Sequence, residues 1–194
     1  SPIGIYLSHE MNAEEVAELE EKFHLNDPVP VQYYYWASGV LTGDLGWSGV
    51  AAAPVTDVFP DKLAATMELA VASAIVAVTL GIGLGTSAGA RRDRAPDHNT
   101  RVVASSGAAM PLFWFAILML IVFWVGLGWF PIGRCDPAVW ASIAHPTGLY
   151  TFAAILAGNW TAFRDAIWHL VLPAVTLGYG ATAIIARMMR SSLV

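Results

Sequence analysis

Three titratable side chains lie at the edges of long apolar stretches and could carry acid–base chemistry. Glu68 precedes one such stretch, and Asp165 and His169 lie where another begins. An ionisable group at membrane depth is by default a candidate functional residue, and a carboxylate with a histidine can move a proton. That chemistry requires two of the groups to converge in one pocket. We expect all three near the outer boundary of a membrane, with no motif joining them, so an intramembrane enzyme is the alternative and not the favoured interpretation.

His169 also invites a metal-binding or proton-relay interpretation. It begins the last predicted apolar helix, over residues 167–187, with Pro173 four residues further on. A metal site needs several nitrogen, sulfur or carboxylate ligands, and this predicted helix has no second histidine or carboxylate at ligand spacing. The single cysteine, Cys135, excludes an intramolecular disulfide and an all-cysteine metal site. We therefore expect no metal or cofactor on this chain, and expect His169 to pack and hydrogen-bond at the end of the helix.

A glycine-rich stretch could be mistaken for a phosphate-binding loop. Residues 81–85 read Gly-Ile-Gly-Leu-Gly, but no strand precedes them and no Lys-Ser or Lys-Thr pair follows. Gly81, Gly85 and Gly89 instead lie four residues apart, the spacing that lets two helix backbones approach closely. We predict that this stripe lies against another helix and not against lipid.

Composition identifies the environment of these residues. Of the 194 residues, 56% are hydrophobic and only 13% are charged, whereas about a quarter of the residues of a soluble domain are charged. About 20 apolar residues cross a bilayer as a helix. The sequence predicts an all-α, polytopic transmembrane bundle with three spanning helices, at about 63–90, 102–130 and 167–187.

Two stretches depart from this simple pattern. The span over 102–130 is longer than a bilayer requires, and Pro111 removes one of its helical hydrogen bonds, so we expect it to bend there. The apolar run over 149–157 is too short to cross, which predicts an interfacial or re-entrant helix.

The charges are distributed unevenly along the chain. Residues 1–61 carry ten carboxylates and a single cation, Lys22, whereas four arginines fall within 91–101. Arg187 and Arg190 follow the last span at once. Short basic segments remain in the cytoplasm, so we expect residues 1–62 outside, with short helices over 13–24 and from Pro30, and the chain's C-terminal end inside.

Three matches in sequence carry a family resemblance. His169-Leu-Val-Leu-Pro173-Ala-Val-Thr-Leu-Gly178 and Ala186-Arg187-Met-Met-Arg190-Ser-Ser192 are similar to the signature of the membrane permease subunits of dipeptide, oligopeptide and nickel ABC importers. Gly43-Asp44-Leu-Gly46-Trp-Ser48 resembles a motif that the same family carries between its first two membrane helices. The segments Pro111-Leu-Phe-Trp114 and Leu127 to Gly133 resemble a further motif in the right order.

The resemblance implies a transporter subunit and not an enzyme. Such a subunit forms the translocation path of di- or oligopeptides, with nickel chelates or oligosaccharides as alternatives. A non-transporting membrane assembly protein is a further alternative. The implied partners are a second permease subunit, cytoplasmic ATPase subunits that bind ATP and magnesium, an external substrate-binding protein and the lipid bilayer, but no nucleic acid. The implied location is the prokaryotic plasma (inner) membrane.

The family also has a helix before the position of Ser1, and a cytoplasmic coupling loop and later helices after that of Val194. We therefore expect this chain to be a fragment of one permease. Both final arginines can be simple anchors at a helix C-terminus, but either could also fix the coupling loop, and we expect Arg187 to matter more. The candidate motif and coupling residues are Gly43, Asp44, Gly46, Gly81, Gly85, Gly89, Pro111, Trp114, His169, Pro173, Arg187 and Arg190.

Overall fold

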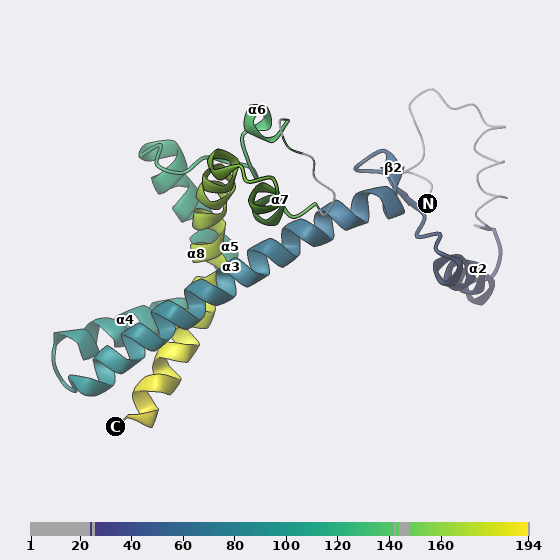
Figure 1. Cartoon of the computed structure of the whole chain (residues 1–194). Helices are drawn as coiled ribbons and strands as arrows, with labels where there is room; N and C mark the ends of the chain where they lie inside the picture. Colours follow the sequence, from purple (N-terminus) through teal and green to yellow (C-terminus); the bar gives the residue numbers. More distant parts are fainter. Residues whose placement is uncertain (1–23, 25, 142, 144–147, 194) are drawn as a thin grey trace. The chain divides into compact units, whose positions relative to one another are not determined.

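The computed structural model describes residue 24 and the ranges 26–141, 143 and 148–193. The chain divides into two units, Ser1–Lys62 and Leu63–Val194. Figure 1 shows that the described residues are mostly helical. This confirms the predicted all-α membrane fold. The helix expected over 13–24 lies outside the described residues, apart from His24.

The first unit contains a helix followed by a hairpin. Helix α2, Val29–Thr42, has a proline in its first turn, as the sequence predicts, and ends at Gly43, whose φ of 93° is left-handed. The Asp44 side chain then accepts a hydrogen bond from the Gly46 backbone N–H at 2.9 Å. Strands β1, Trp47–Ser48, and β2, Ala53–Pro54, pair in antiparallel register. The motif from Gly43 to Ser48 is therefore a helix stop and a turn into a hairpin.

Helix α3, Val55–Ala90, is the first helix long and apolar enough to cross a membrane. It begins eight residues before the predicted start at 63 and contains Pro60 in its second turn. From Leu63 onward the helix belongs to the second unit.

The span expected over 102–130 is broken at Pro111. Helix α4, Ala95–Ala109, ends before it, and α5, Leu112–Met119, continues into the π-helix η2, Leu120–Gly126. The chain bends by 110° between Ala95–Gly107 and Leu112–Gly126. The expected bend at Pro111 is confirmed. Among the described residues, two helices can cross a membrane, or three if this bent pair counts as one span.

Short helices precede the last long one. Helix α6 is Pro137–Trp140, and α7, Tyr150–Leu156, confirms a short, non-spanning helix near the apolar run over 149–157. They share a small core in which the Trp140 ring stacks on Tyr150 at a centroid distance of 3.6 Å.

Helix α8, Trp160–Ser192, starts seven residues before the predicted Ile167. The Asn159 side chain sets this start, because it accepts a hydrogen bond from the Ala162 backbone N–H at 3.1 Å. Pro173 lies inside the helix. A stripe of small residues along α8 is buried, namely Ala174, Gly178, Thr182 and Ala186.

Candidate functional site

Glycines join α3 to α8 along a close helix–helix seam. A β-carbon added to Gly81 would lie 2.7 Å from Ile185 Cβ, and one added to Gly85 would lie 2.7 Å from the Ala186 carbonyl oxygen. One added to Gly89 would meet Leu193 Cβ at 2.8 Å. Each distance is too short for a real side chain. The prediction that this stripe packs against a helix is therefore confirmed, and α8 is that helix.

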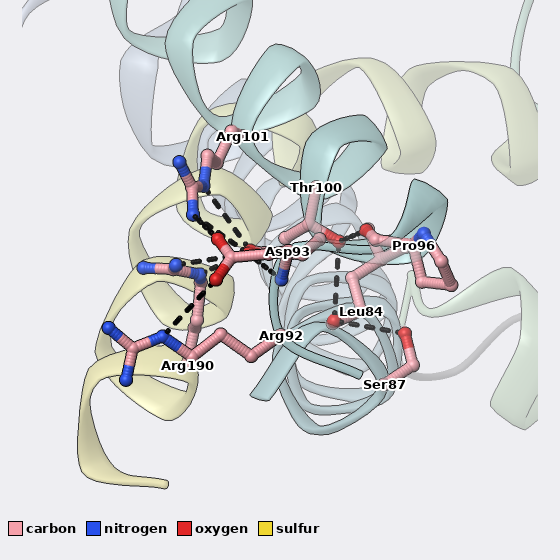
Figure 2. Close-up of polar contacts among 9 residues, drawn as sticks. Leu84, Ser87, Arg92, Asp93, Pro96, Thr100, Arg101 and Arg190 are labelled. Carbon is pink, nitrogen blue, oxygen red and sulfur yellow. Dashed lines mark hydrogen bonds and ion pairs between the residues drawn. The ribbon is translucent and has the colours of Figure 1, made fainter. Parts of the chain in front are cut away.

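One end of the seam carries a network of charged side chains around Asp97, in the first turn of α4. We call Asp97, Arg101 and Arg190, together with the Asp93 backbone N–H, the Asp97 cluster. The Asp97 side chain is completely inaccessible to solvent. Arg190, in the last turn of α8, donates to both of its oxygens, from Nε to Oδ1 and from Nη2 to Oδ2 at 3.1 Å. The contact thus ties α4 to the end of α8 (Figure 2).

Arg101 and the local backbone complete the coordination of Asp97. Arg101 donates from Nη2 to Oδ2 at 2.8 Å and from Nε to Oδ1 at 3.3 Å. The Asp93 backbone N–H donates to Oδ2 at 3.1 Å. Two guanidinium groups therefore hold one carboxylate in paired, planar contacts, which is the strong and directional form of this interaction.

Neighbouring hydrogen bonds extend this junction to a third helix. Thr100 Oγ1 donates to the Leu84 carbonyl oxygen of α3 at 3.3 Å, as Figure 2 shows. Arg187 Nη2 donates to the Ala104 carbonyl oxygen of α4 at 3.3 Å. Both motif arginines thus bind α4, but Arg190 is the one with the bidentate contact. The geometry therefore makes Arg190 the stronger candidate for fixing the end of α8, whereas the sequence led us to expect that Arg187 would matter more.

Asp97, Thr100 and Arg101 are absent from the candidates chosen from sequence. A signal for one pair was present, because Asp97 and Arg101 are four residues apart in a helix that starts after Arg94. The partner from α8 could not be found this way, since 93 residues separate Asp97 from Arg190.

A second charged group lies at the other end of the α3–α8 seam. We call Glu68, Arg134 and Thr151 the Glu68 cluster. Glu68 Oε1 accepts from the Thr151 backbone N–H at 2.7 Å and from its hydroxyl at 2.6 Å, and Oε2 accepts from Arg134 Nη2 at 3.1 Å. The Arg134 guanidinium lies 3.9 Å from the centroid of the Tyr150 ring. Both Glu68 oxygens accept hydrogen bonds, so this carboxylate positions the start of α7.

His169 is 6% exposed and lies inside α8, not at its end as predicted. Its Nδ1 lies 2.9 Å from the Asp165 carbonyl oxygen and 3.4 Å from Oδ1 of the same residue. The predicted hydrogen bonding of His169 is confirmed. Because α8 starts at Trp160, Asp165 lies one turn earlier on the same helix, so the expectation of no carboxylate at ligand spacing was wrong. Within the described ranges, no three His, Cys, Asp or Glu residues could hold a metal ion.

Glu68 and His169 nevertheless line one hollow, of about 230 Å³. An adjoining hollow of about 370 Å³ is lined by His169 and by apolar residues of α5 and α8. Pro173 lines both hollows. Sequence reasoning did not find this convergence, because Glu68 and His169 lie on different helices.

The remaining candidates lie elsewhere. Gly43, Asp44 and Gly46 form the turn of the first unit. Pro111 is the residue before α5, and Trp114 on α5 is 46% exposed. Neither of these two contributes to the charged clusters.

No protein-family model matches the chain. Three similar curated relatives are permeases. The dipeptide transport system permease protein DppB of Alkalihalophilus pseudofirmus is 36% identical over 194 residues, covering 100% of this chain and 58% of the relative. The probable D,D-dipeptide transport system permease protein DdpB of Escherichia coli K12 is 35% identical over 180 residues, covering 92% and 52%. The di/tripeptide transport system permease protein DppB of Pseudomonas aeruginosa is 34% identical over 178 residues, covering 91% and 52%.

The chain spans about half the length of the curated relatives it matches. These relatives are transport permeases and not enzymes, so the intramembrane-enzyme alternative is not supported. The alignment with the Alkalihalophilus pseudofirmus permease covers the whole chain, including the sequence motifs and both long helices. Over all or most of its length the chain is similar to membrane permease subunits of dipeptide transport systems.

Proposed function

We propose that this chain forms part of the translocation path of an ATP-driven importer of short peptides. The observation that carries the proposal is the alignment of the whole chain with a dipeptide permease at 36% identity. In this proposal an external binding protein delivers the peptide, a second permease subunit completes the path, and separate ATPase subunits bind ATP and magnesium. Nickel chelates or oligosaccharides are the alternative cargo.

The two ends of the α3–α8 seam would face opposite sides of the membrane. The Asp97 cluster lies among the exposed cations Arg91, Arg92 and Arg94, which supports a cytoplasmic position for that end. The Glu68 cluster would then lie on the outer side, together with residues 1–62.

The Asp97 cluster would act as a rigid joint in coupling. Transport by alternating access needs helices that move together when partner subunits change state. Arg190 ends α8 at the position after which the family places its ATPase-docking loop, and its two bonds to Asp97 fix that end to α4. A displacement of the docking loop would therefore be passed to α4 as well as to α8.

The test is reconstitution of the complete transporter with its binding protein in vesicles. We expect the permease to co-purify with an ATPase subunit, peptide to stimulate ATP hydrolysis, and labelled dipeptide to enter the vesicles. If the permease co-purifies with an ATPase but only a nickel chelate or an oligosaccharide stimulates ATP hydrolysis, the cargo is that compound and not a peptide. Failure to co-purify with any ATPase would contradict the transporter proposal itself and favour a non-transporting assembly protein.

A further inference from the structure

Two hollows between α3, α5 and α8 adjoin each other. Both are lined by Leu69, Gly133, His169 and Pro173, and we call the two together the His169 hollow. Its first part includes the Glu68 cluster, and its second part has walls of Leu112, Ala116, Leu120, Leu172 and Leu177. The space therefore has one polar edge and one apolar wall.

The imidazole of His169 offers this space a hydrogen-bond acceptor. The Asp165 carbonyl oxygen can only accept, so the proton of a neutral ring lies on Nδ1, and Nε2 keeps its lone pair. Nε2 has no hydrogen-bond partner among the described residues, although the residue is only 6% exposed. No described side-chain nitrogen or oxygen is both sealed from solvent and unpaired. Nε2 is therefore accessible, and a donor that enters the hollow lined by His169 can bond to it.

The charges at the polar edge limit the ligand further. Glu68 and Arg134 are paired at 3.1 Å, so the edge carries no net charge. Such an edge suits a ligand that is neutral overall, including a zwitterion. Ligand pockets with an apolar lining and a few fixed polar groups usually measure about 300 to 1,000 Å³, and a part of about 370 Å³ is at the small end of that range.

We propose that the His169 hollow is a binding subsite for a short peptide with an apolar side chain. His169 Nε2 accepts a hydrogen bond from a peptide N–H, and the wall of α5 and α8 holds the side chain. This inference rests on the proposed function, that the chain carries short peptides. An acyl chain would fit the apolar wall but brings no donor for Nε2, which is why the observations favour a peptide.

Binding is measured directly with a photoreactive peptide. Glycyl-photoleucine is added to the complete transporter in vesicles, and the sample is irradiated. Mass spectrometry then identifies the labelled segment. We expect adducts on α5 or α8 at the hollow, removed by excess Gly-Leu and much less by excess Gly-Gly. Ala116→Trp fills the hollow and should abolish the adducts. Ile117→Trp is the matched control, because Ile117 is half-exposed on the same helix and does not line the hollow.

Two substitutions separate the acceptor from the anchor of His169. His169→Asn retains a donor near the position of Nδ1 but lacks Nε2, whereas His169→Gln places an amide near the position of Nε2. Loss of one hydrogen bond should lower competition by Gly-Leu about five- to tenfold in His169→Asn, with partial recovery in His169→Gln. If His169 were only structural, Gly-Leu would compete equally well in the two variants.

Three results would overturn the subsite. They are adducts that Gly-Leu does not remove, labelling of the hollow by a photoreactive lipid but not by the peptide, and crosslinking from position 116 to the second permease subunit. In each case, continued uptake of Gly-Gly would leave the proposed peptide transport intact. Absence of uptake of every peptide would contradict the proposed function instead.

Discussion

The two charged clusters at the ends of the α3–α8 seam hold a carboxylate in different ways. Asp97 is inaccessible to solvent and is bound by two guanidinium groups, one from its own helix and one from α8. Glu68 is bound by one guanidinium and by the backbone and hydroxyl groups of Thr151. The first arrangement depends on charge, and the second depends largely on neutral donors at the start of a short helix.

This difference indicates what each end can tolerate. Neutralising Asp97 would leave Arg190 without its carboxylate and Arg101 with only the exposed Asp93 carboxylate at 3.4 Å, beside further arginines. Neutralising Glu68 would still leave an oxygen that can accept from Thr151. The Asp97 end should therefore be sensitive to charge, and the Glu68 end to the shape and reach of the side chain.

The largest effect should come from separating the seam that joins the two ends. Gly85→Leu would drive a side chain into the Ala186 backbone, because an added β-carbon already lies 2.7 Å from its carbonyl oxygen. We expect loss of assembly with the partner subunits and loss of peptide uptake. Gly83→Leu is the matched control, since an added β-carbon there meets nothing within 4 Å. Equal behaviour of the two variants in co-purification and uptake would place the stripe toward lipid.

The next largest effect is expected at Asp97. Asp97→Asn should lower the apparent Tm of the purified transporter by roughly 5 °C or more, because the arginines lose their shared counter-ion. Asp93→Asn is the comparison, since the Asp93 side chain is 71% exposed and its ion pair with Arg101, at 3.4 Å, is solvated, while its backbone N–H still bonds to Asp97. A thermal-shift experiment in detergent measures both. If both substitutions shift Tm equally, the buried position of Asp97 has no special role.

Coupling should depend on the planar contact of Arg190. Arg190→Lys keeps the charge but not the two parallel hydrogen bonds to Asp97, so we expect peptide-stimulated ATPase activity to fall about threefold or more. Arg187→Lys should reduce it less, because Arg187 makes a single bond to the Ala104 carbonyl oxygen, which an ammonium can also make. Normal stimulation in Arg190→Lys would leave this residue a membrane anchor only.

Glu68→Gln should have a smaller effect than Asp97→Asn. The amide oxygen can still accept from Thr151, and only the ion pair with Arg134 is lost, at a cost of about 1 kcal/mol. Glu68→Ala removes both contacts and should be clearly worse. Denaturation midpoints of the two variants measure this, and Glu68→Gln as harmful as Glu68→Ala would show that charge governs this end too.

Sequence reasoning succeeded where the signal is local and periodic. The apolar stretches predicted the long helices, and the four-residue spacing of Gly81, Gly85 and Gly89 predicted a packed face. It failed at boundaries and at distant pairs. Asn159 starts α8 earlier than the hydrophobic pattern indicates, which moved Asp165 onto the helix of His169. The Asp97–Arg190 contact and the hollow shared by Glu68 and His169 depend on how helices cross, which no spacing in the chain encodes.

The two ends of the seam should face opposite sides of the membrane. Cys135 adjoins Arg134 of the Glu68 cluster, and Asn99 is an exposed residue of α4 near the Asp97 cluster. In intact cells, an impermeant thiol reagent should label Cys135. It should label Asn99→Cys, in a Cys135→Ser background, only after the membrane is permeabilised. Labelling of Asn99→Cys in intact cells would overturn the orientation.

The rate of labelling at Cys135 should itself depend strongly on pH. Burial raises the pKa of the Cys135 thiol, and the Asp165 carboxylate raises it further. The thiolate is the reactive form, so a raised pKa means that less of it is present at neutral pH. Labelling should therefore be slow at pH 7 and accelerate about tenfold per pH unit until the raised pKa is reached. Asn99→Cys is the control after permeabilisation, because a solvated thiol should approach its maximal rate at a lower pH. Identical pH profiles at the two positions would show that Cys135 does not pack against the core of α6 and α7.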